Sequence, residues 1–198
     1  MAGQADKLGF SDETLIETRI DGGTVYPGSF FRIEKDRVRL PDGGTAFREF
    51  MRHPGAAAVI PLFEDGTVLV ERQFRYPVDR VFIELPAGKI DRGEHSLETA
   101  RRELAEETGY AADEWYFVTT IHNAIGYSDE HIDLYLAKKL HKGKAHLDAE
   151  EFIQSLRMPV GELVDWVRQG RITDVKTIVG IFWLEKIAAG QWNAEKMA

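Results

Sequence analysis

Hydrophobic and polar residues alternate through the first half of the chain in a way that is typical of β-strands. Between residues 15 and 53 this pattern covers TLIETRI, TVYPGSFFRIEKDRVRL and TAFREFMRH, and the last two are separated by the turn sequence PDGG. A small antiparallel meander is therefore predicted.

The next strands, AAAVIPLF and TVLVERQF, flank Asp65-Gly66, which is a strong hairpin signal. VFIEL at 81–85 is predicted as a short strand that ends at Pro86.

Later segments have helical periodicity. Ser96 fits an N-cap and Gly109 a C-terminal stop, so a helix is predicted from about Leu97 to Thr108. Two strands, WYFVTTI and HIDLYLAKKL, and then two more helices are expected; the helices run from Val160 to Gln169, before Gly170, and from Thr173 to about Ala189, before Gly190. This order predicts an α/β (α+β) fold, in which helices cover both sides of a mixed sheet.

Composition narrows the possible functions. A chain of 198 residues that is 43% hydrophobic can form one globular domain with a small subdomain. It has no cysteine, so thiolate catalysis and zinc–cysteine sites are excluded. The net charge of −8 argues against nucleic acid as a partner. The apolar run at 56–63 is too short to cross a membrane, and the N-terminus has no signal-peptide pattern, so we expect a cytoplasmic protein without membrane contact.

The helix predicted at 97–108 carries an unusual concentration of acid. Leu97, Ala100 and Leu104 form its apolar stripe, and Glu103 and Glu107 lie at the edge of that stripe. Glu106 lies one step further round the helix, where it can pair with Arg102 at i, i+4. Like charges on neighbouring turns repel, and a divalent cation bound among them would offset that repulsion.

The spacing of these residues matches a known motif. Gly88, Glu94 and the run Arg102-Glu103-Leu104-x-Glu106-Glu107-x-Gly109-Tyr110 follow the pattern G-x5-E-x7-R-E-U-x-E-E-x-G-U, where U is a bulky hydrophobe. The chain therefore resembles the Nudix hydrolases, although Tyr110 stands where an aliphatic residue is commoner. The resemblance implies a Nudix-type α/β/α sandwich over residues 54–198, preceded by an antiparallel β subdomain over residues 1–53.

The same resemblance implies a metal-dependent reaction. Glu103, Glu106, Glu107 and the Ala87 carbonyl are expected to hold Mg²⁺ or Mn²⁺, with Glu94 supporting the site and Arg102 orienting the glutamates. Hard divalent cations prefer such oxygen ligands. The reaction expected is hydrolysis of a nucleoside diphosphate linked to another group. A base must take the proton of the attacking water, and Glu150 and Glu151 of HLDAEEFIQ are the candidates; Glu151 is also a candidate ligand.

Outside the motif, four segments are similar to the ADP-ribose pyrophosphatase branch of the family: VERQFRYP, ELPAGKID, GYSDEHIDLYLAKKL and WVRQGRITDVKTIVGI. This implies that Arg75 contacts the diphosphate, that Glu84 belongs to the substrate site, and that the protein is a homodimer in which the N-terminal subdomain is exchanged. Arg48 is a candidate for a similar role from the partner chain, and Phe30 or Phe31 would stack on the adenine. Surface ion pairs for the arginines and core packing for the aromatic rings are the alternatives.

The expected substrate is ADP-ribose, cleaved to AMP and ribose 5-phosphate. The loop HNAIGYSDE lacks a proline that many such relatives have, which leaves ADP-glucose and GDP-mannose as alternatives. A non-hydrolytic ADP-ribose sensor would lose glutamates of the motif, and this chain keeps them all. A purely structural acidic helix and a hydrolase of oxidised nucleoside triphosphates are the remaining readings.

Overall fold

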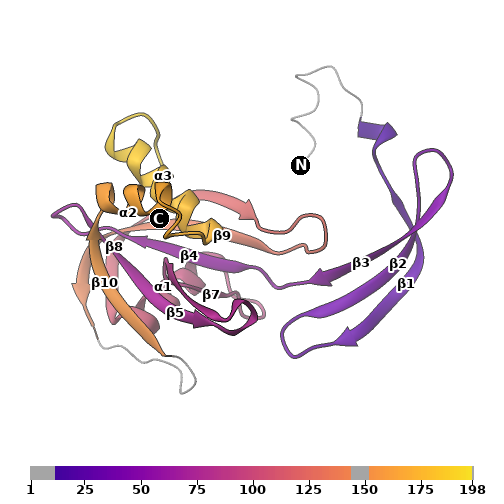
Figure 1. The fold of residues 1–198 in the computed structure, drawn as a ribbon, viewed down its shortest axis with the longest axis horizontal. Helices are drawn as coiled ribbons and strands as arrows, with labels where there is room; N and C mark the ends of the chain where they lie inside the picture. The colour runs from indigo at the N-terminus through magenta and orange to yellow at the C-terminus, as the bar shows by residue number, and fades with distance from the viewer. Residues whose placement is uncertain (1–11, 144–151, 198) are drawn as a thin grey trace. The chain divides into compact units, whose positions relative to one another are not determined.

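The computed structural model describes residues 12–143 and 152–197, so Glu150 and Glu151 lie outside the described residues (Figure 1). The chain divides into two compact units, which we treat separately. The first unit contains the described residues up to His53 together with Ala124–Glu130, and the second contains Pro54–Asn123 and His131 onward. In the described residues, no helix is long and apolar enough to span a membrane.

The first unit is built on an antiparallel sheet in the order β1-β2-β3. Its elements are a 3-10 turn, η2 (Asp12–Thr14), followed by β1 (Thr18–Pro27), β2 (Arg32–Arg39) and β3 (Thr45–Arg52). The predicted meander is present, and the Leu40 carbonyl accepts from Gly43 N at 3.0 Å in the predicted PDGG turn. The expected strand at TLIETRI starts too early, because the 3-10 turn occupies its first residue and β1 begins only at Thr18.

The second unit contains the remaining strands and the helices. Its elements are β4 (Ala56–Pro61), β5 (Thr67–Arg75), η3 (Tyr76–Val78), β6 (Arg80–Glu84), β7 (Ala87–Lys89), α1 (Ser96–Thr108), β8 (Tyr110–His122), β9 (His131–Lys142), β10 (Ile153–Pro159), α2 (Val160–Arg168), α3 (Val175–Ala188) and β11 (Glu195–Lys196).

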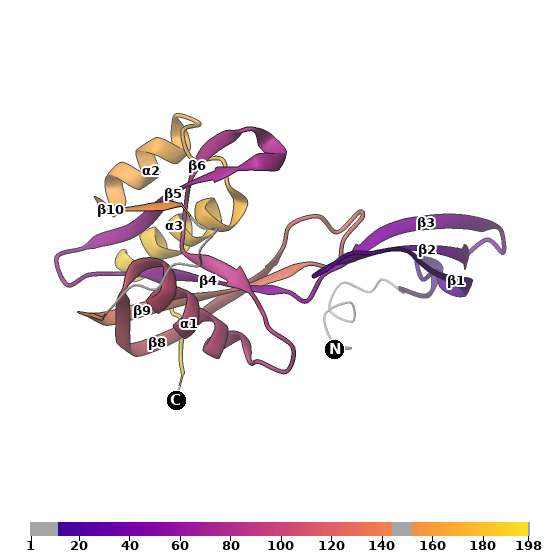
Figure 2. The same ribbon diagram turned by 90° about the horizontal axis from the view of Figure 1, so that it is seen from below.

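Strands of the second unit form two sheets in the described residues. The larger has the order β11-β8-β9-β4-β7 and is mixed, since β4 and β9 are parallel while its other pairs are antiparallel. The smaller has the order β10-β5-β6 and is antiparallel. Figure 2 shows α1 on one side of the larger sheet and α2, α3 and the smaller sheet on the other.

Alternate residues of β4 explain these layers. Ala57 and Val59 pack with Leu97, Ala100 and Leu104 of α1 on one face. The neighbouring side chains of β4 point the opposite way and join the core formed with the smaller sheet, α2 and α3; they are Ala56, Ala58 and Ile60. The predicted mixed sheet with helices on both sides is therefore confirmed.

The start of α1 differs from the prediction by one residue. His95, not Ser96, is the N-cap: its Nδ1 accepts from Leu97 N at 3.4 Å, and Glu98 accepts from His95 N at 3.3 Å. This reciprocal pair is a capping box. The Ser96 hydroxyl is instead hydrogen-bonded to the Tyr135 hydroxyl at 2.8 Å. Gly109 ends the helix with φ of 70°, as predicted.

The start of α3 also differs from the prediction. The helix begins at Val175 rather than Thr173, because Asp174 is its N-cap and accepts from Thr177 N at 3.0 Å. Strands β7, β10 and β11 were not predicted. Two of them are only 3 and 2 residues long, too short to show alternation.

Candidate active site

Arg102 of α1 is the hub of the acidic cluster. Its guanidinium donates to both carboxylate oxygens of Glu94, with Nε–Oε1 at 3.2 Å and Nη2–Oε2 at 3.0 Å. Its Nη1 donates to Glu103 at 2.7 Å and to Glu106 at 3.1 Å, which confirms the predicted i, i+4 pair. Nη2 also donates to the Lys89 carbonyl of β7 at 3.2 Å. The Arg102 guanidinium thus joins three glutamates and β7.

These contacts hold the cluster in its ionised form. Hydrogen bonds from Arg102 lower the pKa of Glu94 from 4.5 to about 2, against the opposing effect of burial, and Thr99 contributes a further hydrogen bond at 2.7 Å. The same hydrogen bonds to Glu94, and then the charge of Glu103, raise the pKa of Arg102. Near neutral pH, Glu94 is therefore a carboxylate and Arg102 a guanidinium.

Glu107 connects α1 with the first residue of β7. Its Oε2 accepts from the Ala87 backbone N–H at 3.0 Å, so the residue whose carbonyl was predicted as a ligand lies directly beside a predicted ligand side chain. Glu107 and Glu103 are both buried, with 6% and 9% of their surface exposed. The edge of the apolar stripe therefore lies under the protein surface rather than in open solvent.

Glycine at position 88 is required by the approach of Glu103. A Cβ on Gly88 would lie 1.8 Å from Glu103 Oε1 and 2.0 Å from its Cδ. A Cβ would fit there only if the Glu103 carboxylate moved, so glycine at position 88 lets this carboxylate lie against β7. The motif glycine thereby sets the position of one predicted ligand.

The donor set suits a divalent cation. Glu103, Glu106 and Glu107 project from two successive turns of α1, and all their donor atoms are the hard oxygens that such ions prefer. Within residues 12–143 and 152–197, no three acidic or imidazole side chains already converge as an ion cage. Hydrogen bonds set the directions of these side chains: Arg102 bridges Glu103 and Glu106, and Glu107 accepts from Ala87 N.

Arg75 and Glu84, both predicted in the substrate site, form a two-pronged ion pair across β5 and β6. Arg75 Nε and Nη2 donate to the two oxygens of Glu84 at 2.9 and 2.8 Å. Burial opposes ionisation of Glu84, but the hydrogen bonds from Arg75 and the charge of Lys176 outweigh it and lower its pKa. The arginine side chain is 42% exposed and the glutamate side chain 6%.

The ion pair lies close to the acidic cluster. Hydrogen bonding to Glu84 raises the pKa of Arg75 most, and the negative charges of Glu107 and Asp174 raise it further. The hydrogen bonds agree with this: Arg75 is bonded to Glu84, and three residues later in the chain Ala87 N donates to Glu107 at 3.0 Å. The structure thus brings a partly exposed guanidinium near the predicted cation ligands.

Sequence reasoning missed the residues that anchor this pair. Lys176 Nζ lies 2.5 Å from Glu84 Oε2 and 3.1 Å from Asp174 Oδ2. Thr177 Oγ1 donates to Asp174 at 2.6 Å and accepts from Leu85 N at 2.8 Å. A lysine in the first turn of a helix opposes the helix dipole, and this is the signal in the sequence that could have indicated a buried anionic partner.

The other predicted substrate residues belong to the first unit. Arg48 Nε donates to Glu17 at 2.9 Å. The rings of Phe30 and Phe31 are edge to face with centroids 4.9 Å apart, and Phe30 also contacts the ring of His53. Their roles toward substrate stay predictions, as do those of Glu150 and Glu151.

Comparison with known proteins adds to this picture. A family model described as the NUDIX domain matches residues 51–177, which is more than half of the chain. The methanol dehydrogenase activator of Bacillus methanolicus is 36% identical over 176 residues, which cover 88% of this chain and 93% of that protein. The ADP-ribose pyrophosphatase of Bacillus subtilis (strain 168) is 33% identical over 175 residues, with coverages of 87% and 95%.

A solved structure supports the fold. The crystal structure of an ADP compounds hydrolase superposes with a TM-score of 0.78 at 23% identity, covering 88% of this chain and 95% of that one. The predicted fold class agrees with this similarity.

Proposed function

This chain belongs to the Nudix family and is a Nudix hydrolase, and we propose that it hydrolyses a nucleoside diphosphate sugar, with ADP-ribose as the preferred substrate. In this reaction the oxygen of a water molecule attacks one phosphorus of the diphosphate. The bond from that phosphorus to the bridging oxygen breaks, the bridging oxygen leaves with the other phosphate, and the water gives up a proton. The products from ADP-ribose are AMP and ribose 5-phosphate.

One observation carries the proposal: the acidic cluster, through Glu107 and Ala87, lies three residues along the chain from Glu84, which holds the partly exposed Arg75. A diphosphate needs both, because its negative charge must be neutralised and its oxygens must be oriented. Arg75 is the residue we assign to the diphosphate oxygens. The name of the Bacillus subtilis relative, ADP-ribose pyrophosphatase, supports the choice of substrate.

Glu103, Glu106, Glu107 and the Ala87 carbonyl are the groups we propose for holding the divalent cation, Mg²⁺ or Mn²⁺. Such a cation, when bound, neutralises charge on the diphosphate and lowers the pKa of a bound water. The chain itself arranges these ligands. Gly88, which has no Cβ, leaves room for the Glu103 carboxylate, and Arg102 fixes Glu103 and Glu106 relative to Glu94. We assign the general base to Glu150 or Glu151.

The deciding experiment is product analysis. The protein is incubated with Mg²⁺ and, separately, ADP-ribose, ADP-glucose, GDP-mannose, NADH and dinucleoside polyphosphates. We expect the fastest release to be AMP and ribose 5-phosphate from ADP-ribose. Equal and slow hydrolysis across the panel would refute the substrate assignment, and tight ADP-ribose binding without turnover would refute hydrolysis itself.

Isosteric variants test whether the acidic cluster is needed for hydrolysis. Glu106→Gln and Glu107→Gln should lower kcat by a factor on the order of 10²–10³, the loss typical of removing an electrostatic contribution to the transition state. Glu98→Gln is the matched control: it makes the same substitution on the same helix, and glutamine preserves the capping box. Circular dichroism of all three proteins should be unchanged.

We also propose that the protein is a homodimer. Several large apolar side chains of the β1-β2-β3 sheet are exposed, among them Val25 at 61%, Tyr26 at 53% and Phe47 at 62%. A monomer seldom leaves such a set open to water. Size-exclusion chromatography with light scattering should give twice the 22.4 kDa chain mass, and a monomer mass would refute the assignment.

A further inference from the structure

Lys176 is a buried cation in an unfavourable place. It lies in the first turn of α3 with 7% of its surface exposed, and that turn contains no acidic residue. The amino end of a helix carries partial positive charge, so both the helix dipole and the loss of water disfavour an ammonium group there. Its two carboxylate partners, Glu84 and Asp174, must offset both effects.

Glu84 links this lysine to Arg75. Its Oε2 accepts from Lys176 Nζ at 2.5 Å and from Arg75 Nη2 at 2.8 Å, while its Oε1 accepts from Arg75 Nε at 2.9 Å. Three donors therefore fix the plane of one carboxylate. The carboxylate in turn fixes the plane of the guanidinium, because the two-pronged pair permits only one relative orientation.

Arg75 and Lys176 differ in what they present to a ligand. The Lys176 side chain is 9% exposed, whereas that of Arg75 is 42% exposed. Arg75 uses Nε and Nη2 on Glu84, and its Nη1 has no hydrogen-bond partner among the described residues. The exposed arginine therefore has donors left for an anion, and the buried lysine shares Glu84 Oε2 with it.

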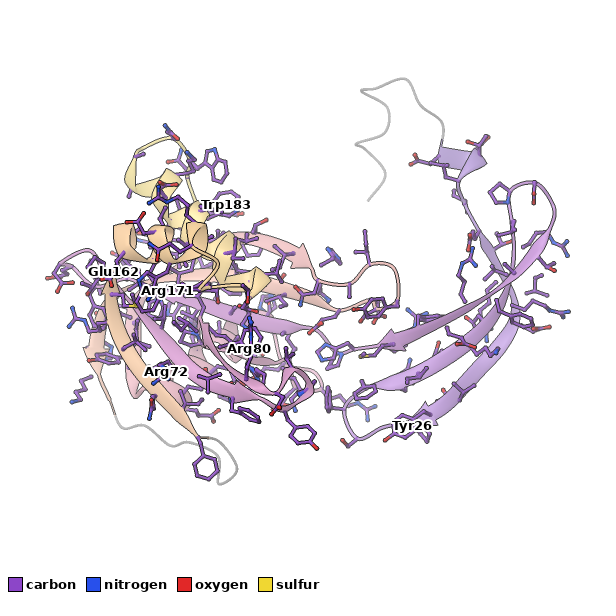
Figure 3. The ribbon with its side chains drawn as sticks, in the orientation of Figure 1. Tyr26, Arg72, Arg80, Glu162, Arg171 and Trp183 are labelled. Carbon is purple, nitrogen blue, oxygen red and sulfur yellow. The ribbon has the colours of Figure 1, made fainter. Side chains whose placement is uncertain are left out.

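The backbone around Lys176 is fixed as well. Thr177 Oγ1 accepts from Leu85 N at 2.8 Å, which ties the first turn of α3 to the residue after Glu84. Arg80, labelled in Figure 3 at the start of β6, donates to the hydroxyl of Thr173 just before the helix. Both ends of β6 are thus bonded to the segment that carries Lys176.

From these contacts we propose that Lys176 is a positioning residue: through Glu84 it holds the Arg75 guanidinium in the orientation that receives the diphosphate of the substrate. The proposal rests on the function proposed above. Lys176 itself touches no substrate atom, and its removal leaves Glu84 free to rotate with Arg75 attached. A lysine that served only to attach α3 would affect stability and leave substrate binding unchanged.

A double-mutant cycle on KM tests the coupling. Lys176→Met should raise KM for ADP-ribose about tenfold, the order expected when one charged hydrogen bond is misplaced, with kcat within about threefold of wild type. Arg75→Gln should raise KM at least as much. The double variant should be no worse than Arg75→Gln alone, because Lys176 acts only through Arg75.

Leu184→Ala is the control for simple destabilisation. Leu184 lies on the same helix, is 2% exposed, and belongs to the apolar core. This variant should lower the melting temperature and leave KM unchanged. If Lys176→Met does not fold, Lys176→Gln takes its place in the cycle with the same expected rise in KM, since glutamine removes the charge but remains polar beside Glu84 and Asp174.

Two results would overturn the positioning role. One is a wild-type KM in the Lys176 variant. The other is a rise in KM in the double variant equal to the product of the two single rises, which would mean that Lys176 contacts the substrate independently.

If wild-type protein does not hydrolyse ADP-ribose, the proposed function fails separately. The positioning role is then tested without substrate, by the Arg75 Nε–H signal in nitrogen-15 NMR, which should be sharp in wild type and broadened in Lys176→Met. An equally sharp signal in both proteins refutes it.

Discussion

The backbone of Gly88 and the carboxylate of Glu103 are so close that even a methyl group at Gly88 would overlap the carboxylate, with a Cβ 1.8 Å from Oε1. Gly88→Ala must therefore displace Glu103 or push β7 away from α1. A shift of about 1 Å in a catalytic group can reduce activity about a hundredfold, and we expect a loss of that size in kcat/KM.

The control for this substitution is Gly161→Ala in the first turn of α2. A Cβ there meets nothing within 4 Å, so activity should equal that of wild type. Steady-state kinetics on both variants decides the matter. A fully active Gly88→Ala enzyme would show that Glu103 is not needed at its observed position.

Cation binding to the acidic cluster should be visible in stability. A ligand that binds only the folded protein raises the free energy of unfolding by about 2.7 kcal/mol at a hundredfold excess over its Kd. Mg²⁺ should therefore raise the melting temperature of wild type, and EDTA should reverse the rise. Glu106→Gln should lose most of this response, because it removes one proposed ligand.

Glu98→Gln again serves as the comparison, since Glu98 is exposed on the first turn of the same helix. Its response to Mg²⁺ should match that of wild type. An identical melting shift in Glu106→Gln and wild type would place the ion elsewhere.

The low pKa of Glu94 predicts a pH dependence of stability. Its pKa of about 2 is below the ordinary 4.5, so its ionised form stabilises the folded state at pH values above 4.5. That contribution is lost as the pH falls from about 4.5 toward 2. Glu94→Gln should therefore be less stable than wild type at pH 6, and the difference should shrink at pH 3. Urea unfolding in EDTA measures the free energy of unfolding of both proteins at pH 6 and at pH 3. A difference between the proteins that is constant with pH would contradict the assignment.

The apolar stripe of α1 gives a stability prediction that is independent of catalysis. Leu104 is fully buried between the helix and the larger sheet, with 0% exposure. Leu104→Ala should lower the free energy of unfolding by about 2–5 kcal/mol, through lost burial and the cavity left behind. Arg101→Ala, at an exposed neighbour whose guanidinium lies over the Trp115 ring, should change it by no more than about 1 kcal/mol. Denaturant titration separates the two, and equal effects would contradict the observed packing.

The sequence predicted the acidic helix well because its signals are local. The stripe of Leu97, Ala100 and Leu104, the stop at Gly109 and the i, i+4 pair of Arg102 with Glu106 all depend on spacing along one helix. The N-cap was wrong by one residue, because Ser96 is a better cap by type, yet its hydroxyl is taken by Tyr135 from a distant strand.

What could not be predicted depends on contacts between distant segments. The reason for a glycine at position 88 appears only when β7 lies against α1. The network of Arg75, Glu84 and Lys176 joins residues 92 positions apart, from Glu84 to Lys176. Helical periodicity carries no information about such partners, although the lysine at the start of α3 indicates that an anion must be near.

The segment Ala124–Glu130 connects two strands of the second unit, β8 and β9, yet it belongs to the first. Its Tyr127 carbonyl accepts from Met51 N at 2.8 Å, and its Asp129 carboxylate accepts from Arg52 Nη1 and from His53 N, both at 2.8 Å. A shortened gene that began at residue 54 would leave this loop without its backbone partners. Any attempt to express the second unit alone, or to graft it onto another protein, therefore has to redesign residues 124–130 as well as choose a new starting point.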